Sequence, residues 1–214
     1  MTRHFQLTFF AKRRLLACAI AIGSIVSLVP GIAVAEVPGT MRVNERTNPP
    51  AGHVYYCAGH PSACNRHGQG AVTLSQQSWD QLLEVNASVN RSIQAKPDGQ
   101  IDEWSAYVPE GDCEDYALTK QQELLRKGWP SDALLLTTAF LEDGTYHAVL
   151  LVRTDRGEFI LDNLKPTILP WQEVHYRWNK RQAVGNPQIW QRVAGAPEPG
   201  TQLPAAGLRL RRIQ

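Results

Sequence analysis

The sequence lacks several motifs that would assign it to well-known functional classes. It contains no Gly-rich phosphate loop, no GxSxG elbow and no dinucleotide-binding fingerprint. Neither nucleotide chemistry nor serine-hydrolase chemistry is therefore indicated, and no organic cofactor is predicted. An EF-hand loop and internal repeats are also missing, so no complete set of calcium ligands can be read from a single motif.

Acidic residues are absent from the first 35 positions. This segment carries four basic residues, then an apolar run from Leu15 to Val29, then the small-x-small sequence Ala33-Val34-Ala35. That order predicts a secretory signal peptide over residues 1–35, cut after Ala35, and a periplasmic location for the mature chain. The apolar run is short for a membrane anchor, and Cys18 has no apolar core before it, which disfavours a lipid anchor.

The basic character of the chain comes from this leader alone. With it the formal net charge is +2, whereas the remainder holds 18 basic and 20 acidic residues, or −2. The mature part has no long basic stripe and no basic run interleaved with aromatic residues. Nucleic-acid binding is therefore not supported.

Cysteine is scarce, with four residues in 214, and three of them follow the leader: Cys57, Cys64 and Cys113. Two can pair in an oxidising compartment, and an unpaired thiol in an exported protein calls for a reason. The segment His53–His67 also has the ligand types of a zinc site. Export favours a Cys57–Cys64 disulfide over zinc, and that pairing leaves Cys113 as the free thiol.

The remaining pattern predicts an α+β fold in which helices precede an antiparallel sheet. One helix is expected from Thr73 or Ser75 to about Ile93, and a second from about Asp112 to Lys127, ending at Gly128. Short apolar runs separated by turns predict a meander of three strands. These strands cover residues 133–140, 146–153 and 158–163.

The segments that flank these helices and strands show a weaker hydrophobic pattern. Residues 36–50 are polar and irregular and are expected to be a flexible lead-in, whereas residues 171–182 and 186–193 are expected to add strands. Residues 195–214 are rich in Pro, Gly and Ala, and we predict a disordered tail. The domain itself is predicted over residues 36–194.

Three residues in this layout have the chemistry of a catalytic triad. Cys113 lies in the first turn of the second helix, where the helix dipole favours a thiolate. His147 opens the second strand and Asp162 closes the third. On adjacent antiparallel strands, the aspartate could orient the imidazole and the imidazole could face the thiol. A structural histidine and a turn-forming aspartate are the competing interpretations.

The segments "GDCEDYA", "HAVL" and "LDN", in this order and at these distances, resemble the bacterial transglutaminase-like cysteine peptidase family, which includes periplasmic proteases of the LapG type. The resemblance covers residues 50–192. It implies a papain-like or transglutaminase-like core, with the nucleophile helix packed on the sheet. It also implies a triad of Cys113, His147 and Asp162, cleavage of a large surface adhesin near small residues, and control by a membrane-bound receptor. His175 has no matching motif.

The acids around Cys113 pose a conflict. As helix caps, Asp112 and the first-turn acids stabilise the helix by ~0.3–1 kcal/mol each, but several full negative charges next to the thiol disfavour a thiolate. A bound divalent cation would remove this conflict, and carboxylate oxygens suit Ca²⁺. The family resemblance implies calcium next to the nucleophile, and the matching residues are Asp112 and Glu114.

Other interpretations remain open at this level. The same triad could transfer an acyl group to an amine, as a transglutaminase does, or the fold could serve as a non-catalytic calcium-binding or partner-binding module. Asn86 and Asn90 lie one turn apart on the first helix. They either tie this helix to a loop or supply an oxyanion donor beside the backbone N–H of Cys113.

Overall fold

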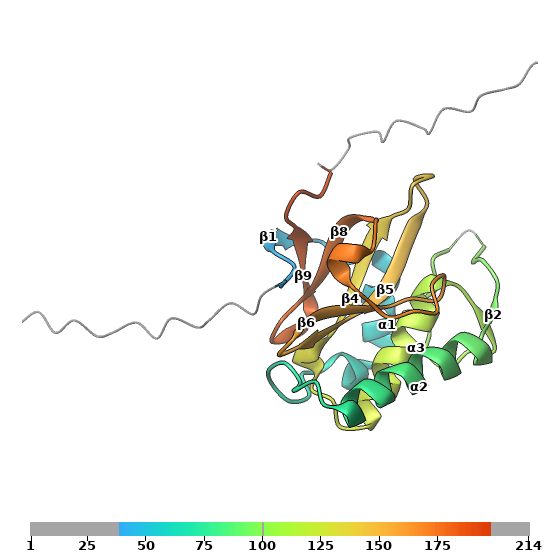
Figure 1. Cartoon of the computed structure of the whole chain (residues 1–214). Helices are drawn as coiled ribbons and strands as arrows, with labels where there is room; N and C mark the ends of the chain where they lie inside the picture. The colour runs from blue at the N-terminus through green and yellow to red at the C-terminus, as the bar shows by residue number, and fades with distance from the viewer. Residues whose placement is uncertain (1–38, 100, 198–214) are drawn as a thin grey trace, which may run out of the picture. The chain divides into compact units, whose positions relative to one another are not determined.

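The computed structural model describes residues 39–99 and 101–197. The predicted signal peptide and residues 198–214 of the predicted tail lie outside this range. The described part consists of one large sheet with helices packed against it (Figure 1). None of its helices is long and apolar enough to span a membrane.

Seven strands form the sheet in the order β1-β9-β8-β4-β5-β6-β7, and every neighbouring pair is antiparallel. The meander β4–β5–β6 therefore forms as predicted, and β8 lies on the other side of β4. The strands are β1 (Val43–Thr47), β4 (Leu134–Phe140), β5 (Tyr146–Thr154), β6 (Gly157–Leu161), β7 (Leu169–Pro170), β8 (Arg177–Ala183) and β9 (Asn186–Val193).

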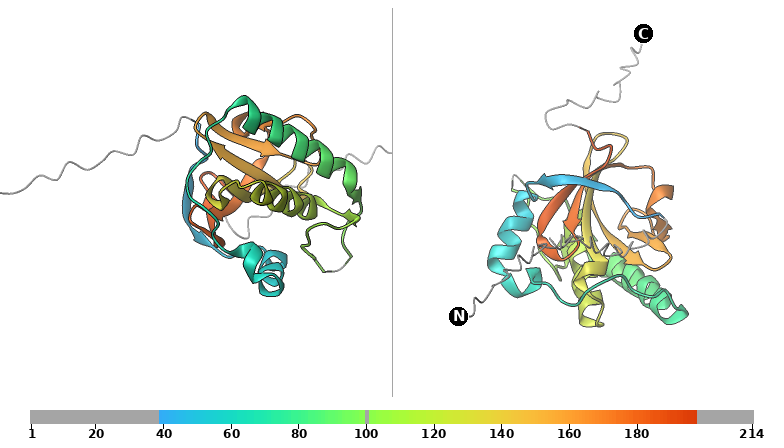
Figure 2. Two further views of the ribbon diagram at one scale, coloured as in Figure 1. Left: turned by 90° about the horizontal axis from the view of Figure 1, so that it is seen from below. Right: turned by 90° about the vertical axis from the view of Figure 1, so that its left-hand side faces the viewer.

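Two helices lie side by side across one face of the sheet (Figure 2, left). The first, α2 (Gln76–Ser92), begins at Ser75, whose hydroxyl accepts the backbone N–H of Ser78 while the Ser78 hydroxyl accepts the N–H of Ser75. The second, α3 (Cys113–Arg126), ends before Gly128, which has the positive φ of +89° that favours glycine. Both helices match the predicted positions.

The sheet is buried on both faces, which explains why β5 is almost continuously apolar. Ala148, Leu150 and Val152 point to the core under α2 and α3, while Val149 and Leu151 point to a second cluster on the opposite face. The alternation follows from the period of two along a strand. Two shorter helical segments, α1 (Ala51–Gly59) and a 3₁₀ turn (Pro61–Cys64), form the region that contains the other two cysteines.

The expectation of a flexible lead-in over residues 36–50 is wrong for the described part of that segment. Its residues 43–47 form β1, which pairs with β9 at the edge of the sheet, and Met41 is fully buried. The strand has no apolar alternation because its stability comes from hydrogen bonds to β9 rather than from a buried face. Another short pair, β2 (Gln94–Ala95) and β3 (Glu110–Gly111), joins the end of α2 to the start of α3.

Candidate active site

The free cysteine of the described residues, Cys113, is the first residue of α3. Its Sγ accepts the backbone N–H of Ala148 on β5 at 3.3 Å, so the nucleophile helix packs directly on the central strands. The thiol donates to Glu114 Oε2 at 3.2 Å. Cys113 is half-buried and packs against the core beneath α3.

His147 and Asp162 lie together at the ends of the neighbouring strands β5 and β6. The imidazole Nε2 is 2.9 Å from Asp162 Oδ1, and both side chains are almost completely buried. An ionised carboxylate only accepts hydrogen bonds, so Nε2 carries the proton and Nδ1 is the nitrogen left for another partner. The β5–β6 register, with Leu150 opposite Leu161, brings the two residues to the same end of the sheet.

The Asp162 carboxylate is held by two further donors. The hydroxyl of Tyr176 donates to Oδ2 at 2.7 Å, and the N–H of Leu164 donates to Oδ1 at 2.9 Å. Burial alone would raise the pKa of Asp162, but the hydrogen bonds and the charge of His147 together lower it. The carboxylate therefore stays ionised against the histidine.

The environment of the thiol opposes its ionisation. Burial and the negative charge of Glu114 raise the pKa of Cys113, and the N–H of Ala148 offsets this only in part. Burial and the neighbouring Asp112 likewise raise the pKa of the Glu114 carboxyl. The conflict expected from the sequence is therefore present in the structure, and the helix dipole does not remove it.

Four carboxylates gather beside Cys113. Oxygen atoms of Asp98, Asp102 and Glu114 lie within 4.8 Å of one another, and those of Asp112 and Glu114 lie within the same distance of the sulfur. Asp112 Oδ1 and Glu114 Oε1 are buried without a hydrogen-bond partner among the described residues. Buried carboxylate oxygens without donors suit a hard cation such as Ca²⁺, so the residues fit the ion that the family resemblance implies.

The other acids of this segment have structural partners. Asp115 accepts the N–H groups of Ser105 and Asp112, and burial raises its pKa to about 6. Glu110 pairs with Lys96 at the surface. The acidic segment therefore divides into a helix-capping part and a part that faces the thiol.

Comparison with known protein families identifies the family of the chain. The sequence model of the bacterial transglutaminase-like cysteine proteinase family matches residues 43–198, more than half of the chain. The chain belongs to this family of cysteine peptidases. The family and the described elements together support the predicted transglutaminase-like α+β fold.

The solved structures that resemble this peptidase include Legionella pneumophila LapG in calcium-bound form, at 27% identity and a TM-score of 0.48, covering 60% of this chain and 76% of that one. Another structure of LapG from the same organism has 28% identity and a TM-score of 0.46, with coverages of 53% and 67%. No curated protein sequence matches the chain. Because both TM-scores lie below 0.5, family membership rests on the sequence model.

Both asparagines of α2 tie the helix of this peptidase to the loop that follows β6. The amide of Asn90 donates to the backbone oxygen of Asp162 at 2.9 Å, and that of Asn86 to the backbone oxygen of Pro166 at 3.0 Å. Their N–H donors are thus engaged, which disfavours the oxyanion interpretation. His175, the competing histidine, is exposed.

Three site residues were not found by sequence reasoning: Tyr176, Asp98 and Asp102. Tyr176 directly follows His175 and reaches Asp162 only because the segment before β8 folds back over the end of β6. Asp98 and Asp102 lie in a loop that approaches Glu114 from ten or more positions upstream. Only the presence of acids before the cysteine motif could have suggested them.

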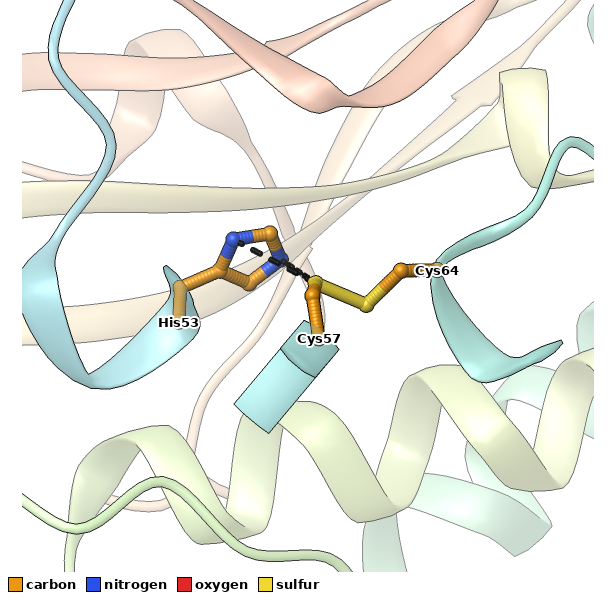
Figure 3. A group of neighbouring side chains, drawn as sticks. All are labelled: His53, Cys57 and Cys64. Carbon is orange, nitrogen blue, oxygen red and sulfur yellow. Dashed lines mark hydrogen bonds between the residues drawn. A yellow bond between two sulfur atoms is a disulfide. The ribbon is translucent and has the colours of Figure 1, made fainter. Parts of the chain in front are cut away.

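The second cysteine region is closed by a Cys57–Cys64 disulfide, as predicted (Figure 3). The fully buried His53 lies next to it, with Nε2 3.6 Å from Cys57 Sγ. The indole N–H of Trp190 points at Nδ1, and the amide nitrogen of Gln182 is 3.1 Å from Nε2. Because His53 Nδ1 accepts the Trp190 N–H and both cysteines are held in the disulfide, this region is poorly placed to ligate zinc.

Proposed function

We propose that this family member is an exported cysteine peptidase in which Cys113 is the nucleophile, His147 the general base and acid, and Asp162 the residue that orients the imidazole. One observation carries the proposal. The thiol at the start of α3 contacts the strand residue next to His147, whose Nε2 is bound by a buried, ionised Asp162. This arrangement supports a nucleophile–base–orienter assignment for acyl transfer.

In the proposed reaction, Cys113 Sγ attacks the carbonyl carbon of the scissile peptide bond, and its proton passes to Nδ1 of His147. The backbone N–H of Cys113, at the first position of α3, is the proposed donor for the developing oxyanion. His147 then donates the proton to the leaving amine, and a thioester forms. Water, deprotonated by His147, hydrolyses the thioester and releases the free thiol.

Asp112 and Glu114, with Asp98 and Asp102, are the proposed calcium ligands. The orphaned oxygens of Asp112 and Glu114 and the absence of an ion pair to any of the four acids, within residues 39–99 and 101–197, support this assignment. Bound Ca²⁺ would offset the negative charge that disfavours a thiolate at Cys113. Without an ion, the four carboxylates repel one another beside the nucleophile.

Alkylation of Cys113 tests both assignments. We expect iodoacetamide to modify Cys113 much faster than a model thiol at pH 7 in the presence of calcium, and at least tenfold more slowly after chelation. Substitution Glu114→Gln should remove the calcium response and the calcium-induced rise in thermal stability. The matched control Glu110→Gln, in the same acidic segment but paired with Lys96, should keep both. Reactivity that ignores chelation would refute the calcium assignment.

The substrate proposed from family membership is a large surface adhesin, cleaved in the periplasm near small residues under the control of a membrane-bound receptor. The experiment compares envelope proteins incubated with wild-type protein and with Cys113→Ala. Cleavage by the wild type alone supports hydrolysis. Incorporation of a labelled amine in place of cleavage would instead favour a transglutaminase. Slow alkylation both with calcium and with chelator would favour a non-catalytic binding module.

A further inference from the structure

One lysine of α3 is completely buried. Lys120 has 0% exposure, and its Nζ has no hydrogen-bond partner among the described residues. It lies seven positions after Cys113, two helical turns along the same face of α3, which is the face that packs on the sheet. A buried ammonium is costly and needs a compensating charge or acceptors. The proposed reaction does not use it.

Contacts between α2 and α3 locate this ammonium. The hydroxyl of Tyr116 reaches the backbone oxygen of Ile93, and the ammonium of Lys127 reaches Glu84, so the two helices run antiparallel. Lys120 lies between these two contacts and is therefore level with the part of α2 that contains Asn86 and Asn90. That part of α2 holds the loop after β6, on which Asp162 lies.

The polar atoms at this level are complementary. The side-chain oxygens of Asn86 and Asn90 are buried and have no donor among the described residues, whereas the Lys120 ammonium has three unused protons. Both amide groups already anchor the loop through their nitrogens. The ammonium makes no hydrogen bond with these oxygens and no ion pair with Asp162 among the described residues, so its effect on the carboxylate that the loop carries acts through space, across the low-dielectric interior.

Asp162 itself lacks a full positive counter-charge when the thiol and His147 are neutral. The carboxylate is 2% exposed, and its hydrogen-bond donors are the imidazole, Tyr176 and a backbone N–H. The nearby Lys165 lies over the Tyr176 ring at 4.9 Å, and the α2 side chains that reach this loop are neutral amides. Lys120 is a completely buried basic residue at the level of this loop.

We propose that Lys120 is a positioning residue of the active site: its buried positive charge adds to the hydrogen bonds that hold the Asp162 carboxylate ionised and aligned with His147. The proposal rests on the proposed function, because it assigns Asp162 the orienting role. The electrostatics agree with the geometry. Burial lowers the pKa of Lys120 to about 7, and the negative charge of Asp162 opposes this shift.

The test measures the electrostatic coupling between Lys120 and Asp162 by NMR, by following the pKa of each residue in a variant that lacks the other. In protein labelled at the lysine Cε and aspartate Cγ carbons, Asp162→Asn should lower the pKa of Lys120 by roughly one unit, and Lys120→Met should raise the pKa of Asp162 by the same amount. Equal and opposite shifts identify a charge pair, which a purely structural lysine would not produce. Lys127→Met, the same change at a solvent-facing position of this helix end, should leave the pKa of Asp162 unchanged.

The functional readout is the alkylation rate of Cys113 at pH 7 in saturating calcium. Lys120→Met should slow it by a factor of several, because Asp162 is less firmly aligned with His147, while Lys127→Met should not. If Lys120→Met does not fold, the pKa of Lys120 in Asp162→Asn still tests the proposal, since that variant retains the lysine. Rapid alkylation of wild type combined with unshifted pKa values would overturn the role of Lys120 and leave the peptidase proposal standing. Slow alkylation of wild type would instead refute the peptidase.

Discussion

Cys57 lies 3.6 Å from a buried histidine, and Cys113 lies against the strand that carries another. The two regions contain the same residue types, but they differ in how many polar atoms are already engaged. At His53, donors approach both ring nitrogens and the neighbouring sulfur is in a disulfide. At His147, one nitrogen binds Asp162 and the thiol is free.

This difference separates a structural cysteine–histidine pair from a reactive one. The side chains around His53 are aromatic, with Trp104 and Trp190 packed edge-on against the imidazole. Around Cys113, buried carboxylate oxygens and a buried ammonium have no partner among the described residues. Evolution tolerates unsatisfied polar groups mainly at functional sites, because elsewhere they only destabilise the fold.

The largest expected effect comes from replacing the cysteine sulfur by a serine oxygen in each of the two regions. Cys113→Ser should reduce cleavage of the envelope substrate at least ~10³-fold, because a hydroxyl at the same position is a far weaker nucleophile. The double variant Cys57→Ser/Cys64→Ser should retain most of the cleavage rate under conditions where it is folded. Both are measured by single-turnover proteolysis. Cleavage by Cys113→Ser at the wild-type rate would contradict the assignment of the nucleophile.

The next effect concerns the pH dependence of stability at His53. Burial lowers the pKa of His53 from 6.5 to about 4. Between these values the unfolded chain binds a proton that the folded chain does not, so stability is lost as the pH falls. From pH 7 to pH 4 this costs about 3 kcal/mol in the free energy of unfolding.

The variant His53→Gln should lack this contribution. Urea unfolding of wild type and variant at both pH values gives the difference directly, because losses from other groups cancel. If the two proteins lose the same free energy on acidification, His53 is not held neutral in the folded state.

The sequence was sufficient to predict the local elements and the residues of the candidate triad. Ser75 and Gly128 limit helices because they cap them by local geometry, and the apolar runs from Leu134 onward form strands that are short and close in sequence. His147 and Asp162 could be placed together because they lie on consecutive strands of a meander.

What the sequence could not predict depends either on contacts between distant segments or on the path of irregular loops. The pairing of β1 with β9 joins the two ends of the domain. The approach of Tyr176 to Asp162 and that of Asp98 to Glu114 depend on how irregular segments fold back, which no hydrophobic periodicity indicates. The burial of Lys120 could not be predicted from the sequence either, since a lysine in a helix is normally solvent-exposed. Its burial follows from the packing of α3 between α2 and β5.

A smaller effect is expected from the disulfide itself. The double variant Cys57→Ser/Cys64→Ser should lower the free energy of unfolding by about 2 kcal/mol, because the bond closes a short loop with a sequence separation of 7. Denaturant titration measures this. Adding Zn²⁺ to the reduced wild-type protein should not restore the loss, since His53 is buried and its Nδ1 accepts the Trp190 N–H. Restoration by zinc would revive the metal-site interpretation of this region.

The smallest effect concerns the tyrosine that supports Asp162. Tyr176→Phe removes the donor to Oδ2 but leaves the donors from His147 and Leu164. A single hydrogen bond is worth about 1 kcal/mol, so Cys113 alkylation and substrate cleavage should each slow about fivefold. Tyr55→Phe, at a largely exposed tyrosine of the disulfide region, is the matched control and should change neither rate. An unchanged rate in Tyr176→Phe would mean that the two remaining donors suffice to hold Asp162. The Cys113 region would then tolerate the loss of a tyrosine hydroxyl as well as the disulfide region does.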